Sequence, residues 1–225
     1  FRRVLFRSLK DYKEEFEEPY FLQYPGDDAD YAFSFAKLRN INTTGISWAF
    51  RYAKFCQGIY LDIFPLDNYN TNNLEENIKE IQYLVGECSA LMRRTCPYPD
   101  DNDLKKLSLY PEVRDVKDVV RDLDSVLRKH EQELADKYIV WSVLVYSIDR
   151  LIFEKRLYDD LIDVDFYGHR VYIPRHYDEV LKISFGDYMK FPPVEERGNW
   201  HSKNIFEPDI PYKDMQQHLW NVDKQ

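Results

Sequence analysis

The amino-acid sequence predicts an α+β fold, because apolar residues alternate with period two near both ends of the chain and recur every three or four residues between them. The chain has 225 residues, of which 44% are hydrophobic and 16% are aromatic. This composition supplies enough apolar surface for one packed domain of ordinary size. Strands come first, then helices, then a hairpin and a further helix, an order that is typical of α+β folds.

Two strands are predicted in the first third of the chain. In Tyr31–Leu38, every second residue from Tyr31 to Lys37 shares one face. Gly58–Pro65 is rich in aromatic and β-branched residues, and Asp62 lies on the face opposite the aliphatic residues that alternate with it. Pro65 has no N–H group to donate, so we expect the second strand to end there.

Three longer helices are predicted in the middle of the chain. Apolar residues recur at three- and four-residue steps through Leu74–Met92. Asn73, with Glu76 three residues later, resembles a capping box at the start of this helix. A second apolar stripe runs through Val113–Leu134. Tyr138–Phe153 is largely apolar, which predicts a buried helix.

A hairpin and a short helix are predicted towards the carboxyl end. Leu161–Phe166 and Arg170–Ile173 flank a Tyr-Gly-His turn, which indicates a β-hairpin. Asp178–Ser184 predicts a helix, with Gly186 near its end as a C-cap. Lys203–Gln225 is polar, and we expect it to form a tail outside a main domain of residues 9–202.

The composition argues against several classes of protein. Lys and Arg number 31 against 40 Asp and Glu, a net charge of −9, which disfavours a nucleic-acid partner because such binding needs a basic surface. No Gly-rich phosphate-binding loop occurs. Cys56, Cys88 and Cys96 lack zinc-site spacing, so we expect three reduced thiols. The apolar run Tyr138–Ile148 is shorter than the roughly 20 residues of a spanning helix. These features favour a cytoplasmic protein.

The beginning of the chain is unusual. Its first residue is Phe1, and its first methionine is Met92. Phe1–Ser8 matches the octapeptide that a common DNA sequencing adapter encodes in one reading frame. We therefore interpret residues 1–8 as a non-native segment fused to a truncated gene. The alternative is a genuine basic N-terminal arm.

Polar residues on and near the first two predicted strands are candidates for chemistry. An unpaired buried carboxylate is costly, so we expect Asp62 to pair with a cation or to bind a metal. Lys37 and Arg39, with the hydroxyl of Thr44 nearby, can hold a phosphate. Asp67 follows the second strand, where a polar group can face a cleft. The structural alternatives are a salt-bridged Asp62, a solvated strand end and a turn-forming Asp67.

Three further residues are weaker candidates. Asp163 and Asp165 share one face of a predicted strand, which is compatible with a second metal site or with a solvated edge. His201 follows a Pro-Pro segment and is the histidine that we single out. No signature of a serine or cysteine nucleophile accompanies these residues.

Two passages, taken together, resemble the LicD family. Asp62–Asp67 has the motif Asp-Ile-Phe-Pro-Leu-Asp, and Gly186–Pro193 has the motif Gly-Asp-Tyr-Met-x-x-Pro-Pro. Each motif is moderately specific, and their occurrence in this order strengthens the resemblance, which covers residues 9–202. The passages also contain Phe35–Asn40, Thr43–Thr44, Gly58–Leu61, Ile173–Pro174, Tyr177–Asp178, Leu181, Phe185, Glu196–Arg197 and His201.

The resemblance implies a nucleotidyltransferase-like mixed sheet with packed helices. It implies transfer of a phospho-alcohol, phosphocholine in the best-known case, from a CDP-linked donor such as CDP-choline to a glycan hydroxyl. Teichoic acid, capsule and lipopolysaccharide are acceptors of this kind, and the enzyme would associate peripherally with the inner face of the membrane. Mg²⁺ or Mn²⁺ is the implied cofactor.

The resemblance also implies roles for individual residues. Asp62 looks like the acid that this fold places on a second strand, so it is the implied catalytic and metal-binding residue. Lys37, Arg39 and the Thr44 hydroxyl would contact the donor phosphate, and Asp67 and His201 would either contact the acceptor or support the residues that do. The implied substrate-binding residues are Lys37, Arg39, Thr44, Asp67 and His201.

The chain departs from the family pattern in one respect. The family has a Gly-Gly turn and an Asp-x-Asp strand that would precede Leu9, and the sequence has no match for them. Since these acids would supply much of the metal site, we expect the chain to be inactive as it stands. The alternatives are a nucleotidyltransferase acting on a small molecule and a non-catalytic binding module of the same fold.

Overall fold

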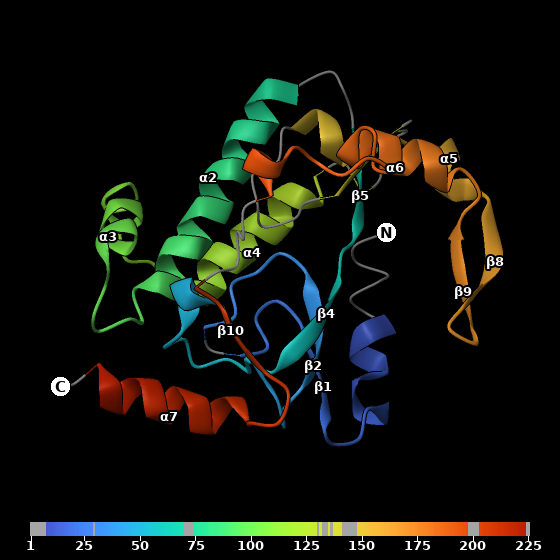
Figure 1. Cartoon of the computed structure of the whole chain (residues 1–225). Helices are drawn as coiled ribbons and strands as arrows, with labels where there is room; N and C mark the ends of the chain where they lie inside the picture. Colours follow the sequence, from blue (N-terminus) through green and yellow to red (C-terminus); the bar gives the residue numbers. More distant parts are fainter. Residues whose placement is uncertain are drawn as a thin grey trace.

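The structure is a mixed α+β arrangement with several small antiparallel sheets, which confirms the α+β class that the sequence predicts. Figure 1 shows it as a computed structural model, with the long helices above and behind a central sheet. No helix in the described part of the chain is long and apolar enough to cross a membrane. The described residues are 8–28, 30–69, 74–129, 131, 135, 137–140, 148–197 and 203–223.

The central sheet has three strands in the order β1 (Tyr20–Gln23), β2 (Ala36–Asn40) and β4 (Ile59–Ile63). Both pairings are antiparallel. Lys37 on β2 lies directly opposite Asp62 on β4. The predicted strand is therefore confirmed over Ile59–Ile63, with Asp62 on the face opposite the aliphatic residues of the strand.

The segment before β2 differs from its prediction. Alternation predicts a strand from Tyr31, whereas pairing begins only at Ala36. Tyr31, Phe33 and Phe35 are all buried, and the residues between them are buried as well, so the segment has no solvent face. The hydroxyl of Tyr31 donates to the backbone carbonyl of Phe35 at 2.9 Å, which holds the segment as a local loop.

Two long helices lie beside each other above the sheet (Figure 1), α2 (Leu74–Arg93) and α4 (Val116–Leu127). Helix α2 confirms the first predicted helix, while its proposed cap, Asn73, lies outside the described residues. Helix α4 begins after Asp115, whose carboxylate accepts from the backbone N–H of Lys117 at 2.8 Å. It is shorter at both ends than its apolar stripe predicts.

Helix α3 (Asp101–Ser108) lies in a stretch for which the sequence predicts no helix or strand. It begins with a capping box, in which Asp100 and Asp103 each accept from the other's backbone N–H. Asp103 is also paired with Arg93 at 2.5 Å and with Arg51 at 3.6 Å. These ion pairs attach the short helix to the end of α2.

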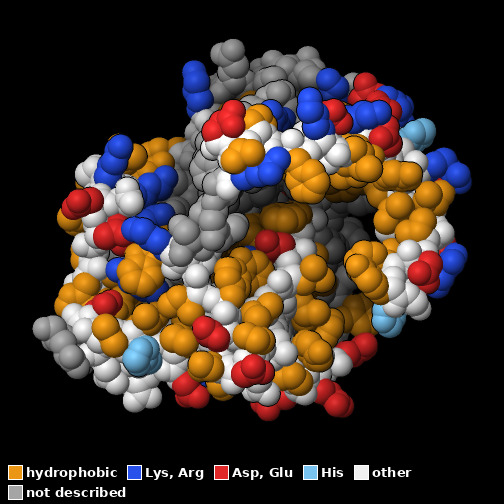
Figure 2. Space-filling view, in the orientation of Figure 1, with side chains coloured by type: hydrophobic (Ala, Val, Ile, Leu, Met, Phe, Trp, Pro, Cys, Tyr) orange, Lys and Arg blue, Asp and Glu red, His pale blue; other side chains and the backbone are white. Residues whose placement is uncertain are grey.

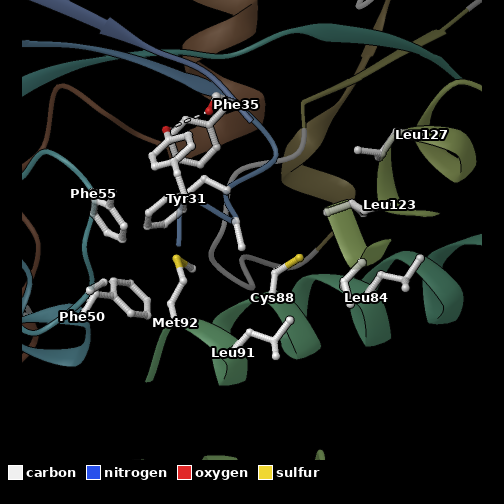
Figure 3. Packing of buried hydrophobic residues seen from close by; sticks show 14 of the residues in the cluster. Tyr31, Phe35, Phe50, Phe55, Leu84, Cys88, Leu91, Met92, Leu123 and Leu127 are labelled. Carbon is white, nitrogen blue, oxygen red and sulfur yellow. Dashed lines mark hydrogen bonds between the residues drawn. The ribbon is translucent and has the colours of Figure 1, made fainter. Parts of the chain in front are cut away.

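The hydrophobic core lies between the aromatic loop Tyr31–Phe35, which precedes β2, and the apolar stripes of α2 and α4. Figure 3 shows the aromatic rings on one side of this core and the aliphatic side chains of the two helices on the other. Neighbouring rings meet edge to face, as Phe33 does with Phe50 at 5.5 Å between centroids. The buried cluster contains Tyr31, Ala32, Phe33, Phe35, Phe50, Ala53, Phe55, Ile81, Leu84, Cys88, Leu91, Met92, Val119, Leu123, Leu127 and Ile139.

A second three-stranded sheet replaces one predicted helix. It consists of β5 (Leu66–Tyr69), β6 (Lys137–Val140) and β7 (Ile152–Glu154), all antiparallel. The prediction of a helix over Tyr138–Phe153 is wrong at both ends, where these strands lie, and residues 141–147 are outside the described part. A short run that is apolar on all sides does not distinguish a buried strand from a buried helix.

The predicted hairpin and its following helix are confirmed. Strands β8 (Leu161–Phe166) and β9 (His169–Pro174) pair in register around Tyr167 and Gly168, which have φ of 51° and 82°. Helix α6 (Tyr177–Phe185) ends at Gly186, whose φ is 70°. The hairpin lies at the edge of the molecule in Figure 1, below α6 and the short helix α5 (Arg156–Asp159).

The expected polar tail begins at Lys203 and contains regular structure. Strand β10 (Ile205–Glu207) pairs with β3 (Thr44–Ile46), and α7 (Tyr212–Val222) lies against the same part of the domain. The side-chain amide of Gln216 on α7 donates to two backbone carbonyls, at 3.1 and 3.2 Å. The described residues also form the short 3₁₀ helices η1 (Lys13–Glu15), η2 (Trp48–Phe50), η4 (Ile148–Leu151) and η5 (Val194–Glu196).

The core gives a prediction about stability. Leu91 on α2 is 7% exposed, whereas Leu104 on α3 is 53% exposed. We expect Leu91→Ala to lower the free energy of unfolding by about 2–5 kcal/mol, because it leaves a cavity. The matched Leu104→Ala should change it by less than about 0.5 kcal/mol. Urea denaturation followed by circular dichroism measures both, and equal losses would contradict this placement of the core.

Candidate functional site

The candidate site is the face of the central sheet on which the charged residues of β2 lie. Lys37 and Arg39 are two residues apart on β2, so their side chains share this face. The register places Asp62 opposite Lys37 and Tyr60 opposite Arg39. The pairing of β2 with β4 therefore gathers two cations, a carboxylate and a phenol in one place.

Lys37 is a buried cation. Its residue is 4% exposed, and its ammonium group donates to the Asp62 carboxylate. The ammonium nitrogen also lies 3.5 Å from the centroid of the Tyr60 ring and 4.9 Å from that of Phe35. Burial lowers the pKa of Lys37 to about 8, although the neighbouring Asp62 favours the charged form.

Asp62 connects this buried cation to the surface. Its side chain is 32% exposed, compared with 5% for the side chain of Lys37. One carboxylate oxygen accepts from the ammonium group, and the carboxylate as a whole remains accessible from solvent. Asp62 is thus salt-bridged, as the structural alternative for this residue predicts, and it is also the part of the pair that a ligand can reach.

Arg39 is buried as completely as Lys37, with 2% of the residue exposed. Its Nε donates to the side-chain oxygen of Gln23 at 2.7 Å, and its Nη1 donates to the backbone carbonyl of Gly58 at 3.0 Å. A Cβ at Gly58 would lie 1.9 Å from the carbonyl oxygen of Asn40, so glycine permits this close approach. The guanidinium group therefore ties β1 and the start of β4 to β2, and the alternative of a solvated strand end is wrong for both cations.

The remaining predicted site residues lie elsewhere. Thr44 is on β3, fully buried, and its hydroxyl donates to the backbone carbonyl of Ile210 at 2.6 Å. Asp67 is buried on β5, opposite Ile139 of β6, so the alternative of a turn-forming Asp67 is wrong. His201 lies outside the described residues. The structure thus brings together Lys37, Arg39 and Asp62, and places the other two described residues on different sheets.

Two residues of the site were missed in the sequence. Tyr60 shares a strand face with Asp62 at a spacing of two, so the alternation of β4 could have identified it. Gln23 is fully buried on β1 and donates its side-chain amide to Asp28 while accepting from Arg39. No sequence pattern indicates Gln23, because its role depends on the pairing of β1 with β2.

The second acidic group lies on the hairpin, away from this face. Asp163 on β8 is paired with Arg170 on β9 at 2.8 Å, and both side chains are exposed. Figure 2 shows hydrophobic side chains gathered on the visible face of the hairpin, with charged groups at its margin. Among the described residues, no group of three or more His, Cys, Asp or Glu side chains is arranged to hold a metal ion. The structure therefore agrees with the solvated edge for Asp163.

No protein-family model matches the chain, and no curated protein or solved structure resembles it at a significant level. A functional assignment therefore has to rest on the geometry of Lys37, Arg39 and Asp62.

The pKa of Lys37 gives a prediction about pH. Because burial lowers this pKa from 10.5 to about 8, the unfolded chain binds more protons than the folded chain between these two values. The contribution of Lys37 to stability therefore rises with pH across this window. Relative to Lys37→Met, we expect the wild-type free energy of unfolding to increase by roughly 1–2 kcal/mol from about pH 7.5 to about pH 9.5.

Urea denaturation at several pH values measures this difference. The matched control is Lys105→Met, which changes an exposed lysine on α3. We expect the difference between the wild type and this control to stay constant with pH. A constant difference between the wild type and Lys37→Met would contradict the burial of the Lys37 ammonium group.

Proposed function

We propose that the chain carries part of the active site of a LicD-like phosphotransferase with a nucleotidyltransferase-like sheet. The observation that carries this proposal is the pairing of Lys37 with Asp62 across neighbouring strands, both of which belong to the first passage that resembles the family. An accessible carboxylate held by a buried cation is a preorganised charged group. Phosphoryl-type transfer depends mainly on such positioning and on neutralisation of charge.

The proposed reaction transfers phosphocholine or a similar phospho-alcohol from a CDP-linked donor to a glycan hydroxyl. The acceptor oxygen attacks the phosphorus that bears the alcohol. The bond from that phosphorus to the bridging oxygen breaks, and CMP leaves with the electron pair of that bond. The hydroxyl proton passes to solvent, so the reaction needs no oxidant, reductant or further co-substrate.

Asp62 is the residue that would hold a divalent cation. Proteins commonly bind Mg²⁺ through one or two carboxylates together with the phosphates of the substrate. The single accessible carboxylate of Asp62 would supply the minimum number of protein ligands for such an ion. When bound, the ion supplies neutralisation of the donor diphosphate. Lys37 is a positioning residue in this proposal, because its ammonium group fixes the Asp62 carboxylate from the interior.

A non-catalytic binding module of the same fold is the second candidate. Two observations favour it: the ion pair with Lys37 already neutralises Asp62, and the described residues contain no cluster of metal-binding side chains. A binding module would retain affinity for a nucleotide ligand without a requirement for Mg²⁺. The two candidates therefore differ in the metal dependence of binding.

Isothermal titration calorimetry of the full chain with CDP-choline tests the proposal. We expect binding that requires Mg²⁺ and that is tighter than the binding of CTP. Asp62→Asn should weaken CDP-choline binding at least tenfold, which corresponds to about 1.4 kcal/mol, because it removes the anionic ligand of the ion. The matched control Asp163→Asn changes an exposed acid on the hairpin and should leave affinity unchanged.

The outcomes separate the candidates. Binding of CDP-choline without Mg²⁺, unaffected by Asp62→Asn, would support the binding module. Preferential binding of CTP would support a nucleotidyltransferase. Failure of the folded chain to bind CDP-choline or CTP at millimolar concentration would contradict all three assignments.

A further inference from the structure

A groove that the proposed function does not use lies along helix α4. It encloses a cavity of about 490 Å³ between α4 and the connection from β1 to β2. The residues of α4 that line it extend from Lys117 to Leu127, which corresponds to roughly 15 Å along the helix axis. Both the volume and the mostly apolar lining are typical of sites for small molecules.

The floor of the groove is apolar. Val120, Leu123 and Leu127 line it from α4, and Phe33 lines it from the opposite wall. Leu123, Leu127 and Phe33 also belong to the hydrophobic core, so the groove exposes the margin of that core. An apolar ligand lying here would extend the core and remove its margin from water.

Three cations lie in the lining of the groove. Lys117 and Arg121 are in the first half of α4, and Lys10 contributes a third positive charge from the segment before β1. Lys10 and Lys117 have no ion-pair partner among the described residues. The acid in the lining, Asp124, is paired with Arg128 at 3.0 Å, so its charge is offset within the protein.

The cations and the apolar floor of the groove together indicate which class of ligand it would bind. In a chain with a net charge of −9, the groove has three cations in its lining and an apolar floor that continues to Leu127. Arg121 is paired with Asp118 at 2.9 Å, so an anionic group in the groove would meet Lys10 and Lys117, and an aliphatic chain would follow Leu123 and Leu127. A nucleotide base would place its polar edge against the apolar floor, where a lost hydrogen bond is costly.

We propose that this groove binds a single-chain amphiphile with an anionic head group, either a fatty-acid carboxylate or an alkyl phosphate. The aliphatic chain lies over Val120, Leu123 and Leu127, and the head group lies between Lys10 and Lys117. The lining of the groove includes neither Lys37 nor Asp62, and the proposal does not rest on the proposed function.

Calorimetric titration of the full chain with three probes tests this proposal, each below its critical micelle concentration. The probes are dodecanoate, dodecyl phosphate and dodecyltrimethylammonium, which have the same chain length and different head groups. We expect one of the two anionic probes or both to bind with a stoichiometry of one, and the cationic probe to bind at least tenfold more weakly. The tighter anionic probe identifies the head group.

Two variants locate the binding. Lys117→Glu reverses an exposed charge and should weaken the anionic probe at least tenfold, while Val120→Phe fills the groove and should have a similar effect. The matched control Lys105→Glu makes the same charge change on α3 and should leave affinity unchanged. Equal affinity for the cationic probe, or unchanged affinity in folded Lys117→Glu, would overturn the proposal even if Val120→Phe failed to fold.

Discussion

The burial of the Lys37 ammonium group is the constraint on which the arrangement of the central sheet depends. Removing a charge from water is costly unless a counter-charge and further contacts replace the lost hydration. Asp62 supplies the counter-charge, and the rings of Tyr60 and Phe35 supply their electron-rich faces. Asp62 and Tyr60 face Lys37 only in the observed register of β2 and β4, because a shift by one residue would turn both side chains to the other face.

The aromatic loop Tyr31–Phe35 contributes side chains to both the hydrophobic core and the candidate site. Phe33 and Phe35 belong to the buried cluster against α2 and α4, and both rings also lie within reach of the Lys37 ammonium group. Phe33 lines the groove along α4 as well. The core, the charged pair and the groove therefore share one short stretch of chain, so a change of shape in one of them affects the others.

The sequence predicts the longer elements that have one face in solvent, and it misses elements that are short or buried on both faces. The alternation of β4 and of the β8–β9 hairpin identifies those strands, since a half-exposed strand shows its period. The aromatic loop from Tyr31 is covered on both sides, and β6 and β7 are only four and three residues long, so their apolar runs carry no period that identifies them. Asp62 was identifiable as a candidate because an acid interrupts an apolar strand. The burial of Lys37 and Arg39 could not be predicted, because Tyr60 and Phe55, which help to cover them, are distant in sequence.

A double-mutant cycle on Lys37 and Asp62 tests the central claim most directly. The free energy of unfolding would be measured for the wild type, Lys37→Met, Asp62→Asn and the double variant at neutral pH. The expected result is a coupling energy of at least about 1 kcal/mol, because each single change leaves the other member of the pair uncompensated. The exposed pair of Asp178 and Lys182 on α6 serves as the reference and should show much weaker coupling. Additive effects of Lys37→Met and Asp62→Asn would contradict the account.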